Sequence, residues 1–422
     1  MAEDPWGEPI RGEDEAFEAV VYLQSPQAIR DRCRALFYLA RQDRLHHFRL
    51  NLDALPAATT YVQRLIDQRY PQAAIPFHSR WRHFEVGGQS RLDLLEPALS
   101  RLSALERARL KVDLAVTSVL LDAGAGSAWR YVEPQTGLAW QRSEGLAMAS
   151  FHSFTQGLFS SRPDTPWQAD AAGLAQLTTD SLAQAFQVTP TNPLLGLEGR
   201  VQLLQKLGHT LNQYPQWFGT AVPRPGHLVD YWQHQALQGR LSAVAVLQTV
   251  LHSLGTIWPG RVVLGGVNLG DVWPHPQLPD SAPGRQLVPF HKLSQWLTYS
   301  LLEPLQELGL TITDLDQLTG LAEYRNGGLF MDLGVLVPKS PAVTQIAHPP
   351  DSPVIVEWRA LTLCLLDDLA HDLRQRLNLS PEALPLVKVL QGGTWTAGRQ
   401  IAAEKRPGGP PPITLLSDGT VF

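Results

Sequence analysis

The segment from Glu323 to Asn326 places an acid, a phenol, a base and an amide between two apolar runs, and two glycines follow at once. An acid and a base in apolar surroundings must pair with each other or meet a polar ligand, because an isolated buried charge costs too much. Adjacent glycines let the backbone turn and expose its N–H groups. The segment therefore predicts either a binding site or a structural ion pair.

A second acid and base, Glu357 and Arg359, lie two residues apart at the start of an apolar helical pattern. Side chains two residues apart on a helix do not face each other, so each needs a partner from elsewhere. Cross-pairing with Glu323 and Arg325 would give a buried charged network that requires no catalysis. The sequence leaves this alternative open.

Asp271 lies in a glycine-bounded segment, GGVNLGDVWPHP, beside Trp273. The glycines suggest a phosphate loop, but Pro274 and Pro276 exclude the helix that a dinucleotide fingerprint needs at its last glycine. We therefore reject a nucleotide-binding fold. On the residues alone, an Asx-type turn with a packed tryptophan is the favoured interpretation.

The segment PFHSRWRHFE contains two arginines and two histidines. Its histidines, His78 and His83, are five residues apart, which does not match a helical metal site. Arg80 and Arg82 can both donate to phosphate or carboxylate oxygens. An anion pocket and a surface ion-pair cluster remain equal interpretations.

Two further candidates lie at predicted helix starts. His291 and Lys292 begin a strongly apolar helix, where a cation opposes the helix dipole and should have an anionic partner. Glu144 precedes another apolar helix, where a carboxylate favours the dipole. No Ser-His-Asp order, Cys-His pair or metal motif rises above background, so we expect no metal and no cofactor.

Composition limits the class of protein. The chain has 422 residues, of which 44% are hydrophobic and 18% charged, with a net charge of -5 and a pI near 6.2. This balance argues against nucleic-acid binding. Two cysteines indicate a reducing compartment, and both Cys33 and Cys364 lie on apolar helical faces. The acidic N-terminus resembles no signal or transit peptide, and no apolar run is long enough to span a bilayer. We therefore expect a cytoplasmic protein that does not enter a membrane.

Helical periodicity dominates the pattern. We predict helices near residues 25–44, 57–70, 94–122, 197–214, 241–254, 288–309 and 354–378. Pro289 should lie in the first turn of one helix, and Pro304 should kink or end it. Strands are few: a hairpin over 128–142, and short pieces over 260–267, 329–337 and 413–422. We expect an acidic mobile tail over residues 1–20 and one large, mainly α domain over 21–422, in one or two lobes.

Several long motifs resemble the uracil-catabolism proteins of fungi and bacteria, which belong to a pathway that yields urea. The likeness extends from about Val20 to Phe422. The motifs are SRWRHFE, LLDAGAGSAWRY, RSEGLA, GLEGRVQLL, PGRVVLGGVNLGDVW, PFHKLSQWLTYSLLEPL, LTGLAEYRNGGLF, VEWRALT, LQGGTWTAGR and SDGTVF.

The order GRVQLLQKLG, NLGDVW, VPFHKLSQWLTY, LTGLAEYR, LGVL and VEWRALT is similar to that of the queuosine-salvage nucleotide glycosidases. That resemblance implies an α-rich fold related to DNA glycosylases and cleavage of an N-glycosidic bond in a 5′-phosphorylated ribonucleoside. It places Asp271 at the catalytic aspartate. Glu323 stands where those proteins usually have Asp, and their pocket tryptophans and loops differ, so substrate identity does not transfer.

Together the two resemblances imply an N-glycosidase that splits a ribosylurea 5-phosphate into urea and ribose 5-phosphate. Asp271 and Glu323 are the expected catalytic carboxylates. Arg82, Lys292 or Arg325 would neutralise the 5′-phosphate. The expected substrate-binding residues are Arg82, His83, Glu144, Trp273, His291, Lys292, Tyr324, Arg325, Asn326, Glu357 and Arg359.

The expected partners are the small phosphorylated ribosyl substrate and other enzymes of uracil catabolism. Two alternatives stay open. One is a metal-independent, amidohydrolase-like step on a ureido intermediate, for which the sequence offers no activated nucleophile. The other is a non-catalytic scaffold in the pathway, which predicts a closed interior and an exposed apolar patch.

Overall fold

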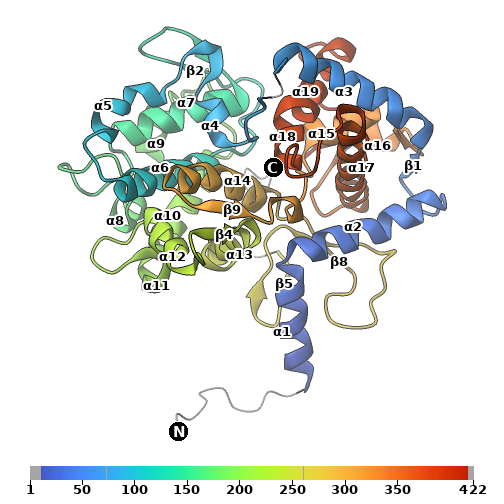
Figure 1. Cartoon of the computed structure of the whole chain (residues 1–422), viewed down its shortest axis with the longest axis horizontal. Helices are drawn as coiled ribbons and strands as arrows, with labels where there is room; N and C mark the ends of the chain where they lie inside the picture. The colour runs from blue at the N-terminus through green and yellow to red at the C-terminus, as the bar shows by residue number, and fades with distance from the viewer. Residues whose placement is uncertain (1–10, 73, 260, 417–422) are drawn as a thin grey trace. The chain divides into compact units, whose positions relative to one another are not determined.

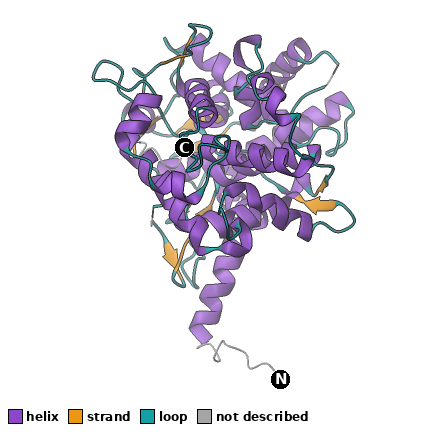
Figure 2. Cartoon of the chain, turned by 90° about the vertical axis from the view of Figure 1, so that its left-hand side faces the viewer, coloured by secondary structure: helices purple, strands orange, loops and turns teal. Residues whose placement is uncertain are grey.

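The computed structural model describes residues 11–72, 74–259 and 261–416. Helices form most of this part of the chain, and the strands are short (Figure 2). The prediction of a mainly α fold is confirmed. The chain forms two compact units, one from residues 11–75, 259–291 and 316–416 and the other from 76–258 and 292–315. The assignment of residues 21–422 to one domain stays a prediction.

Unit 1 contains eight helices among the described residues and eight short strands, labelled in part in Figure 1. The helices are α1 (Arg11–Leu23), α2 (Pro26–Arg41), α3 (Leu55–Arg69), α15 (Tyr324–Asp332), α16 (Ala342–Gln345), α17 (Pro353–Leu377), α18 (Leu386–Val389) and α19 (Trp395–Lys405). The strands pair as β1 (Phe48–Leu50) with β10 (Leu336–Pro338), β5 (Val263–Leu264) with β6 (Val267–Asn268), β7 (Val272–Pro274) with β8 (Leu287–Pro289), and β11 (Ala347–His348) with β12 (Thr414–Leu415).

The core of unit 1 forms around α17, which packs against α2, α3 and α15. Ser25 caps α2 by accepting a hydrogen bond from the N–H of Ala28, and Pro26 occupies the first turn, within the helix predicted near residues 25–44. Cys33 of α2 and Cys364 of α17 are both buried, and burial raises the pKa of each thiol. The prediction that both cysteines belong to the core is confirmed.

Unit 2 contains the remaining helices and two strand pairs. The helices are α4 (Arg80–His83), α5 (Glu96–Leu99), α6 (Ala104–Leu120), α7 (Arg142–Thr155), α8 (Ala171–Ala175), α9 (Thr179–Ala185), α10 (Leu197–Gln213), α11 (Pro215–Phe218), α12 (Leu228–Gln235), α13 (Ala243–Leu254) and α14 (Lys292–Glu307). The strand pairs are antiparallel β2 (Tyr131–Val132) with β3 (Ala139–Trp140), and parallel β4 (Arg240–Ser242) with β9 (Thr311–Thr313).

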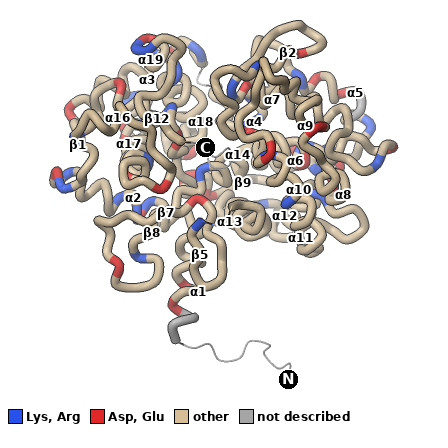
Figure 3. The backbone as a smooth tube through the Cα atoms, turned by 180° about the vertical axis from the view of Figure 1, so that it is seen from behind, with Lys and Arg blue, Asp and Glu red and all other residues tan. Residues whose placement is uncertain are grey.

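The core of unit 2 forms around α6, which packs against α7, α10, α12 and α14. Most of its side chains from Leu110 to Leu120 are buried, in agreement with the nearly all-apolar sequence there. Within both units, Lys and Arg are interspersed with Asp and Glu along the chain (Figure 3).

Several element boundaries differ from the sequence-based prediction. The tail predicted for residues 1–20 overlaps α1, whose Val20 is buried; residues 1–10 lie outside the described part. The helix predicted over 94–122 is two helices, because Ser103 caps a new one at α6. Pro289 belongs to β8, and Pro304 lies inside α14, which continues to Glu307.

The strand predicted over residues 329–337 is also wrong in its first half. Residues up to Asp332 are helical, and the strand is limited to Leu336–Pro338. The hairpin predicted over 128–142 is confirmed by β2–β3. The single strand predicted over 260–267 is wrong as drawn, because Gly265 and Gly266 turn the chain between the antiparallel strands β5 and β6. The tail strand predicted over 413–422 is confirmed only as β12, because residues 417–422 lie outside the described part.

Candidate active site

The main chain of Asp271 is fixed by the β7–β8 hairpin. Its carbonyl accepts hydrogen bonds from the N–H groups of Phe290 (3.0 Å) and His291 (3.3 Å). Gly270 precedes it with a φ of +65°, a conformation that glycine adopts without strain. An Asx-type contact just before it is made by Asn268, whose Oδ1 accepts from the N–H of Gly270 (3.1 Å). The hairpin bonds and Gly270 therefore fix the position from which the carboxylate of Asp271 projects.

That carboxylate forms a bidentate pair with Arg359. Nη1 of Arg359 donates to Oδ1 and Nη2 to Oδ2, each over 2.7 Å. The indole N–H of Trp273 donates to Oδ1 over 2.7 Å. The exposed fraction of the side chain is 13% for Asp271 and 2% for Arg359, so these bonds form with little competition from water. Three donors of fixed geometry therefore hold the carboxylate of Asp271.

Arg359 also connects this carboxylate to the segment that carries Glu323. Its Nε donates to the carbonyl of Ala322 over 3.0 Å, and its guanidinium lies 4.0 Å from the ring centroid of Phe290. Ala322 directly precedes Glu323 in the chain. One arginine of α17 therefore contacts both the Asp271 turn and the residue before the second candidate acid.

Glu323 is the N-cap of α15. Its Oε2 accepts from the N–H of Arg325 (2.7 Å) and its Oε1 from the N–H of Asn326 (2.6 Å). Asn326 in turn donates from its side chain to the carbonyl of Leu321 (3.1 Å). A buried carboxylate at a helix N-terminus satisfies main-chain donors and favours the helix dipole.

The two glycines after Asn326 do not form a turn. Both lie inside α15, where a Cβ at Gly327 would approach the indole of Trp358 to 2.6 Å. A Cβ at Gly328 would approach Cδ of Pro412 to 3.0 Å. The pair therefore allows close packing of α15, and the prediction of an exposed, turning backbone is wrong.

Glu357 and Arg325 each contact groups outside the two acid–base pairs. Glu357 accepts from the N–H groups of His46 (3.3 Å) and His47 (3.0 Å), and Nε2 of His275 lies 3.5 Å from it. Arg325 donates to the carbonyl of Gly409 (3.0 Å) and lies over the ring of Tyr324 (5.0 Å). Glu357 is fully buried, so these contacts account for it without a ligand.

His291 ends the unit 1 segment with a φ of +47°, which is uncommon for a residue other than glycine. Its Nε2 donates to the carbonyl of Leu23 (2.9 Å), and burial lowers the pKa of its imidazole. The imidazole is thus a neutral donor that ties the hairpin to α1.

In unit 2, the predicted arginines are engaged in ion pairs. Arg82 pairs with Glu303 (2.9 Å) and Glu85 (3.2 Å), as the ion-pair interpretation predicts. Arg80 is fully buried rather than at the surface: Nε donates to Oγ of Ser118 (2.6 Å), and Nη1 lies 3.2 Å from Asp122. The rings of Phe84 and Trp296 lie 5.9 and 5.5 Å from its guanidinium.

The other candidates of unit 2 lie at helix ends. Lys292 is the first residue of α14, and its Nζ lies 5.6 Å from the ring centroid of Trp296. Glu144 is buried in the first turn of α7, as the dipole argument predicts. His83 is buried at the end of α4, and desolvation lowers the pKa of its imidazole.

A second buried network in unit 2 was not predicted from the sequence. Glu133 accepts two bonds from Arg91 (3.0 and 2.8 Å) and lies 3.1 Å from Nε2 of His152. Arg91 also lies 5.5 Å from the ring centroid of Trp140. The acid Glu133 within the β2–β3 hairpin was a sign of a buried ion pair, but the sequence does not identify its partners, which are distant along the chain.

The described residues contain no group of three or more His, Cys, Asp or Glu side chains placed to hold a metal ion. Among the same residues, no helix combines the length and apolar character needed to cross a membrane.

Comparison with known proteins gives full-length matches. A family described as "Protein of unknown function (DUF1688)" matches residues 22–422. Protein urg3 of Schizosaccharomyces pombe is 40% identical over 412 residues, which cover 96% of this chain and 99% of that protein. Uracil catabolism protein 4 of Lachancea kluyveri is 39% identical over 438 residues, with the same coverage. These matches confirm the resemblance to uracil-catabolism proteins, and the chain belongs to the DUF1688 family.

Proposed function

We propose that this chain acts in uracil degradation as an N-glycosidase that hydrolyses ribosylurea 5-phosphate to urea and ribose 5-phosphate. The name of the Lachancea kluyveri relative supports the pathway. The similarity of segment order to nucleotide glycosidases supports the reaction class. The observation that carries the proposal is the carboxylate of Asp271, which Arg359 and Trp273 hold with three hydrogen bonds of 2.7 Å.

Glycosidic hydrolysis passes through a state in which positive charge develops at C1′ of the ribose. A carboxylate stabilises that charge best when it is ionised and already oriented, so that no reorganisation is needed during the reaction. The bidentate bond from Arg359 stabilises the negative charge of Asp271, and the indole of Trp273 fixes the plane of its carboxylate. Asp271 is therefore suited to stabilise the oxocarbenium-like state and to orient the attacking water.

In the proposed step, the C1′–N bond breaks as a C–O bond forms between C1′ and the water oxygen. One water proton ends on the departing urea nitrogen, and the other remains on the new hydroxyl of ribose 5-phosphate. Glu323 directly follows Ala322, whose carbonyl accepts from the arginine that holds Asp271, so we assign it the ribose hydroxyls or a share of the water proton. Arg82, Lys292 and Arg325 remain predictions as phosphate ligands, and each is tested by the KM of its Met variant.

The test is to incubate the purified chain with synthetic ribosylurea 5-phosphate and measure urea together with free reducing sugar. We expect equimolar release, and a loss of turnover in Asp271→Asn. The matched control is Asp351→Asn, which removes an exposed acid of unit 1 and should leave turnover unchanged. Normal turnover by Asp271→Asn would contradict the role assigned to Asp271.

The product pattern also separates the alternatives. Ammonia or carbon dioxide without reducing sugar would indicate an amidohydrolase-like step on the ureido group. No turnover of ribosylurea 5-phosphate or of UMP would favour a scaffold role. UMP also serves as a specificity control, because a ribosylurea enzyme should leave its intact pyrimidine ring attached to ribose.

A further inference from the structure

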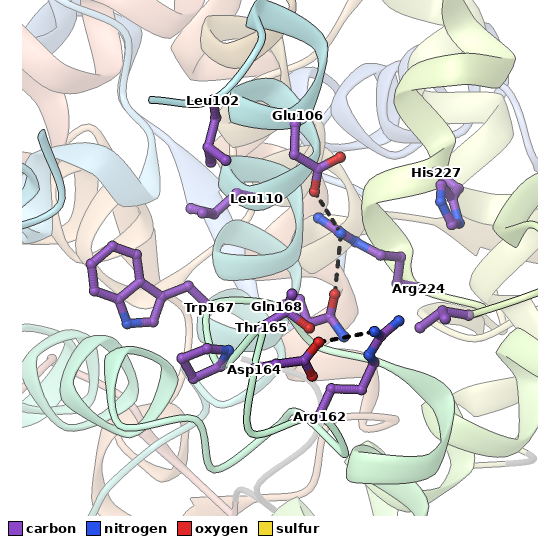
Figure 4. A pocket seen from close by; sticks show the side chains of 12 residues that line it. Leu102, Glu106, Leu110, Arg162, Asp164, Thr165, Trp167, Gln168, Arg224 and His227 are labelled. Carbon is purple, nitrogen blue, oxygen red and sulfur yellow. Dashed lines mark hydrogen bonds and ion pairs between the residues drawn. The ribbon is translucent and has the colours of Figure 1, made fainter. Parts of the chain in front are cut away.

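Unit 2 contains a cavity of about 470 Å³, which lies within the size range of small-molecule sites. It lies beside α6, between a first loop of residues 162–168 and a second loop of residues 222–227. Figure 4 shows the side chains that line it. They are Leu102, Glu106, Leu110, Arg162, Asp164, Thr165, Pro166, Trp167, Gln168, Val222, Arg224 and His227.

Both loops are held in place by one buried carboxylate. Asp113 of α6 accepts from the N–H of Ala169 (3.4 Å), at the end of one loop, and from the N–H of Gly226 (2.6 Å), in the other. Asp170 adds a bond from the N–H of Ser161 (2.8 Å). Because these bonds fix the main chain on both sides, the cavity is preformed, and a ligand need not order the loops when it binds.

The charged groups of the lining lie close to opposite charges, although Nη2 of Arg224 is a buried donor with no hydrogen-bond partner among the described residues. Arg224 is 6% exposed; it donates to Oε1 of Glu106 (2.7 Å), and its Nε lies 2.8 Å from Asp113. Nearer the solvent, Arg162 pairs with Asp164 (3.1 Å). The dashed lines of Figure 4 mark the first and last of these pairs. An anionic ligand would have to compete with Glu106 and Asp113 for Arg224, and a cationic ligand with the arginines.

The remaining polar groups suit a neutral ligand that has both donors and acceptors. His227 donates from Nδ1 to the carbonyl of Phe218 (2.7 Å), so its Nε2 is an acceptor, and burial lowers the pKa of this imidazole. The exposed guanidinium of Arg162 has further N–H donors. The indole of Trp167 is anchored by a bond from Nε1 to the carbonyl of Thr155 (2.9 Å), which presents a fixed flat wall.

We propose that this cavity binds a neutral, flat molecule with amide-type N–H and C=O groups, of nucleoside size. The charge balance excludes strong anion or cation recognition, the indole and the leucines supply apolar contact, and donors and acceptors occur together. The inference stands on the cavity alone and does not rest on the proposed glycosidase reaction.

The test uses uridine as the neutral probe and uridine 5′-phosphate as its anionic counterpart, with binding measured by calorimetry and saturation-transfer NMR. Two variants fill the cavity from half-buried positions, Val222→Trp and Leu102→Trp, and circular dichroism checks their folding. We expect uridine to bind the wild type and to lose at least about tenfold in affinity in both variants.

The affinity for uridine 5′-phosphate should not fall to a comparable extent in the two cavity-filling variants. Release of urea from ribosylurea 5-phosphate, if the proposed reaction holds, should be unchanged in both variants, so the two proposals fail independently. The inference is overturned if uridine does not bind, if both folded variants bind it as the wild type does, or if the filling substitutions weaken the phosphate ester as much as uridine.

Discussion

Arg359 binds the carboxylate of Asp271 through two parallel hydrogen bonds of 2.7 Å, although 88 positions separate these residues in the sequence. Arg359 lies on the early turns of α17, and Asp271 lies in the turn before β7. Nε of Arg359 donates a third hydrogen bond, to the carbonyl of Ala322 (3.0 Å). In the proposed reaction Arg359 would therefore act as a positioning residue, since it donates to Asp271 and to the main chain before Glu323.

Replacing Arg359 separates its charge from its geometry. Arg359→Lys keeps a cation but cannot donate in parallel to both carboxylate oxygens. We expect kcat for ribosylurea 5-phosphate to fall by about 10²-fold, because a small misplacement of a catalytic group has an effect of this size. The acid limb of the pH–rate profile should stay in place, since a positive charge remains beside Asp271.

Arg359→Met removes the charge as well, so the acid limb of the same profile should move to higher pH. Thermal melting of both variants checks that the fold persists. A kcat for Arg359→Lys equal to that of the wild type would show that the bidentate bond has no part in the reaction.

Glu323 has a structural and a proposed chemical role, and three substitutions distinguish them. Glu323→Ala removes both acceptors of the α15 cap and should lower the free energy of unfolding by about 1–2 kcal/mol. Glu323→Gln retains an amide oxygen that can accept one of the two N–H groups, and Glu323→Asp retains a strong capping residue.

If Glu323 also shares the water proton, Glu323→Gln should lose turnover by about 10²-fold while it loses less stability than Glu323→Ala. Glu323→Asp introduces the acid that the nucleotide glycosidases resembled by the motifs usually have at this position, and it should keep part of the activity. Denaturant unfolding and the urea assay measure the two effects. If stability and activity fall in parallel across all three variants, Glu323 acts only as the N-cap of α15 and has no part in the reaction.

Local chemistry made part of this structure predictable. Ser25 and Pro26 fix the start of α2 through groups that are neighbours in sequence. The same holds for the β2–β3 hairpin, whose turn lies between its own strands. The bond between Arg359 and Asp271 could not be predicted from neighbouring residues, because no local pattern selects one of several distant acids as the partner of Arg359.

The Gly-Gly pair after Asn326 failed as a turn signal for a related reason. Glycine permits a turn, but it also permits close packing, and only the position of Trp358 on α17 decides between them. Pro289 was misplaced because an extended residue and a helix N-terminus both accept proline. Each of these errors concerns a residue whose local preference is compatible with two structures.

Close packing of α15 against α19 predicts a severe effect at Gly398. A Cβ there would lie 2.1 Å from the carbonyl oxygen of Arg325, which is main chain and cannot rotate away. Gly398→Ala should therefore lower the free energy of unfolding by about 1–3 kcal/mol, as overpacking does elsewhere. Gly255→Ala is the matched control, since its Cβ would enter open space at a φ of -57°.

Urea denaturation of the two glycine variants measures the difference. The control should be neutral, or more stable by about 0.4–1 kcal/mol, because alanine restricts the unfolded chain. Since Arg325 lies next to the α15 cap, Gly398→Ala should also reduce turnover. Equal stability of the two variants would contradict the packing described for α15 and α19.

The buried network of Glu133 predicts how stability depends on pH. Hydrogen bonds from Arg91, together with those from His152 and Thr136, lower the pKa of Glu133 from 4.5 to about 2. A carboxylate whose pKa is lower in the folded state stabilises the fold fully above its unfolded pKa. That contribution should be lost as the pH falls from about 4.5 toward 2.

Glu133→Gln should remove this pH dependence and lower the free energy of unfolding at pH 7 by about 3–5 kcal/mol, because Arg91 is left buried without its anionic partner. The measurement is denaturant unfolding of the wild type, Glu133→Gln and the exposed control Asp351→Asn at several values between pH 7 and pH 3. The free energy of unfolding of the control should change with pH as that of the wild type does. The difference in unfolding free energy between the wild type and Glu133→Gln should become smaller as the pH falls. A difference in unfolding free energy that stays constant over this range would show that Arg91 does not lower the pKa of Glu133.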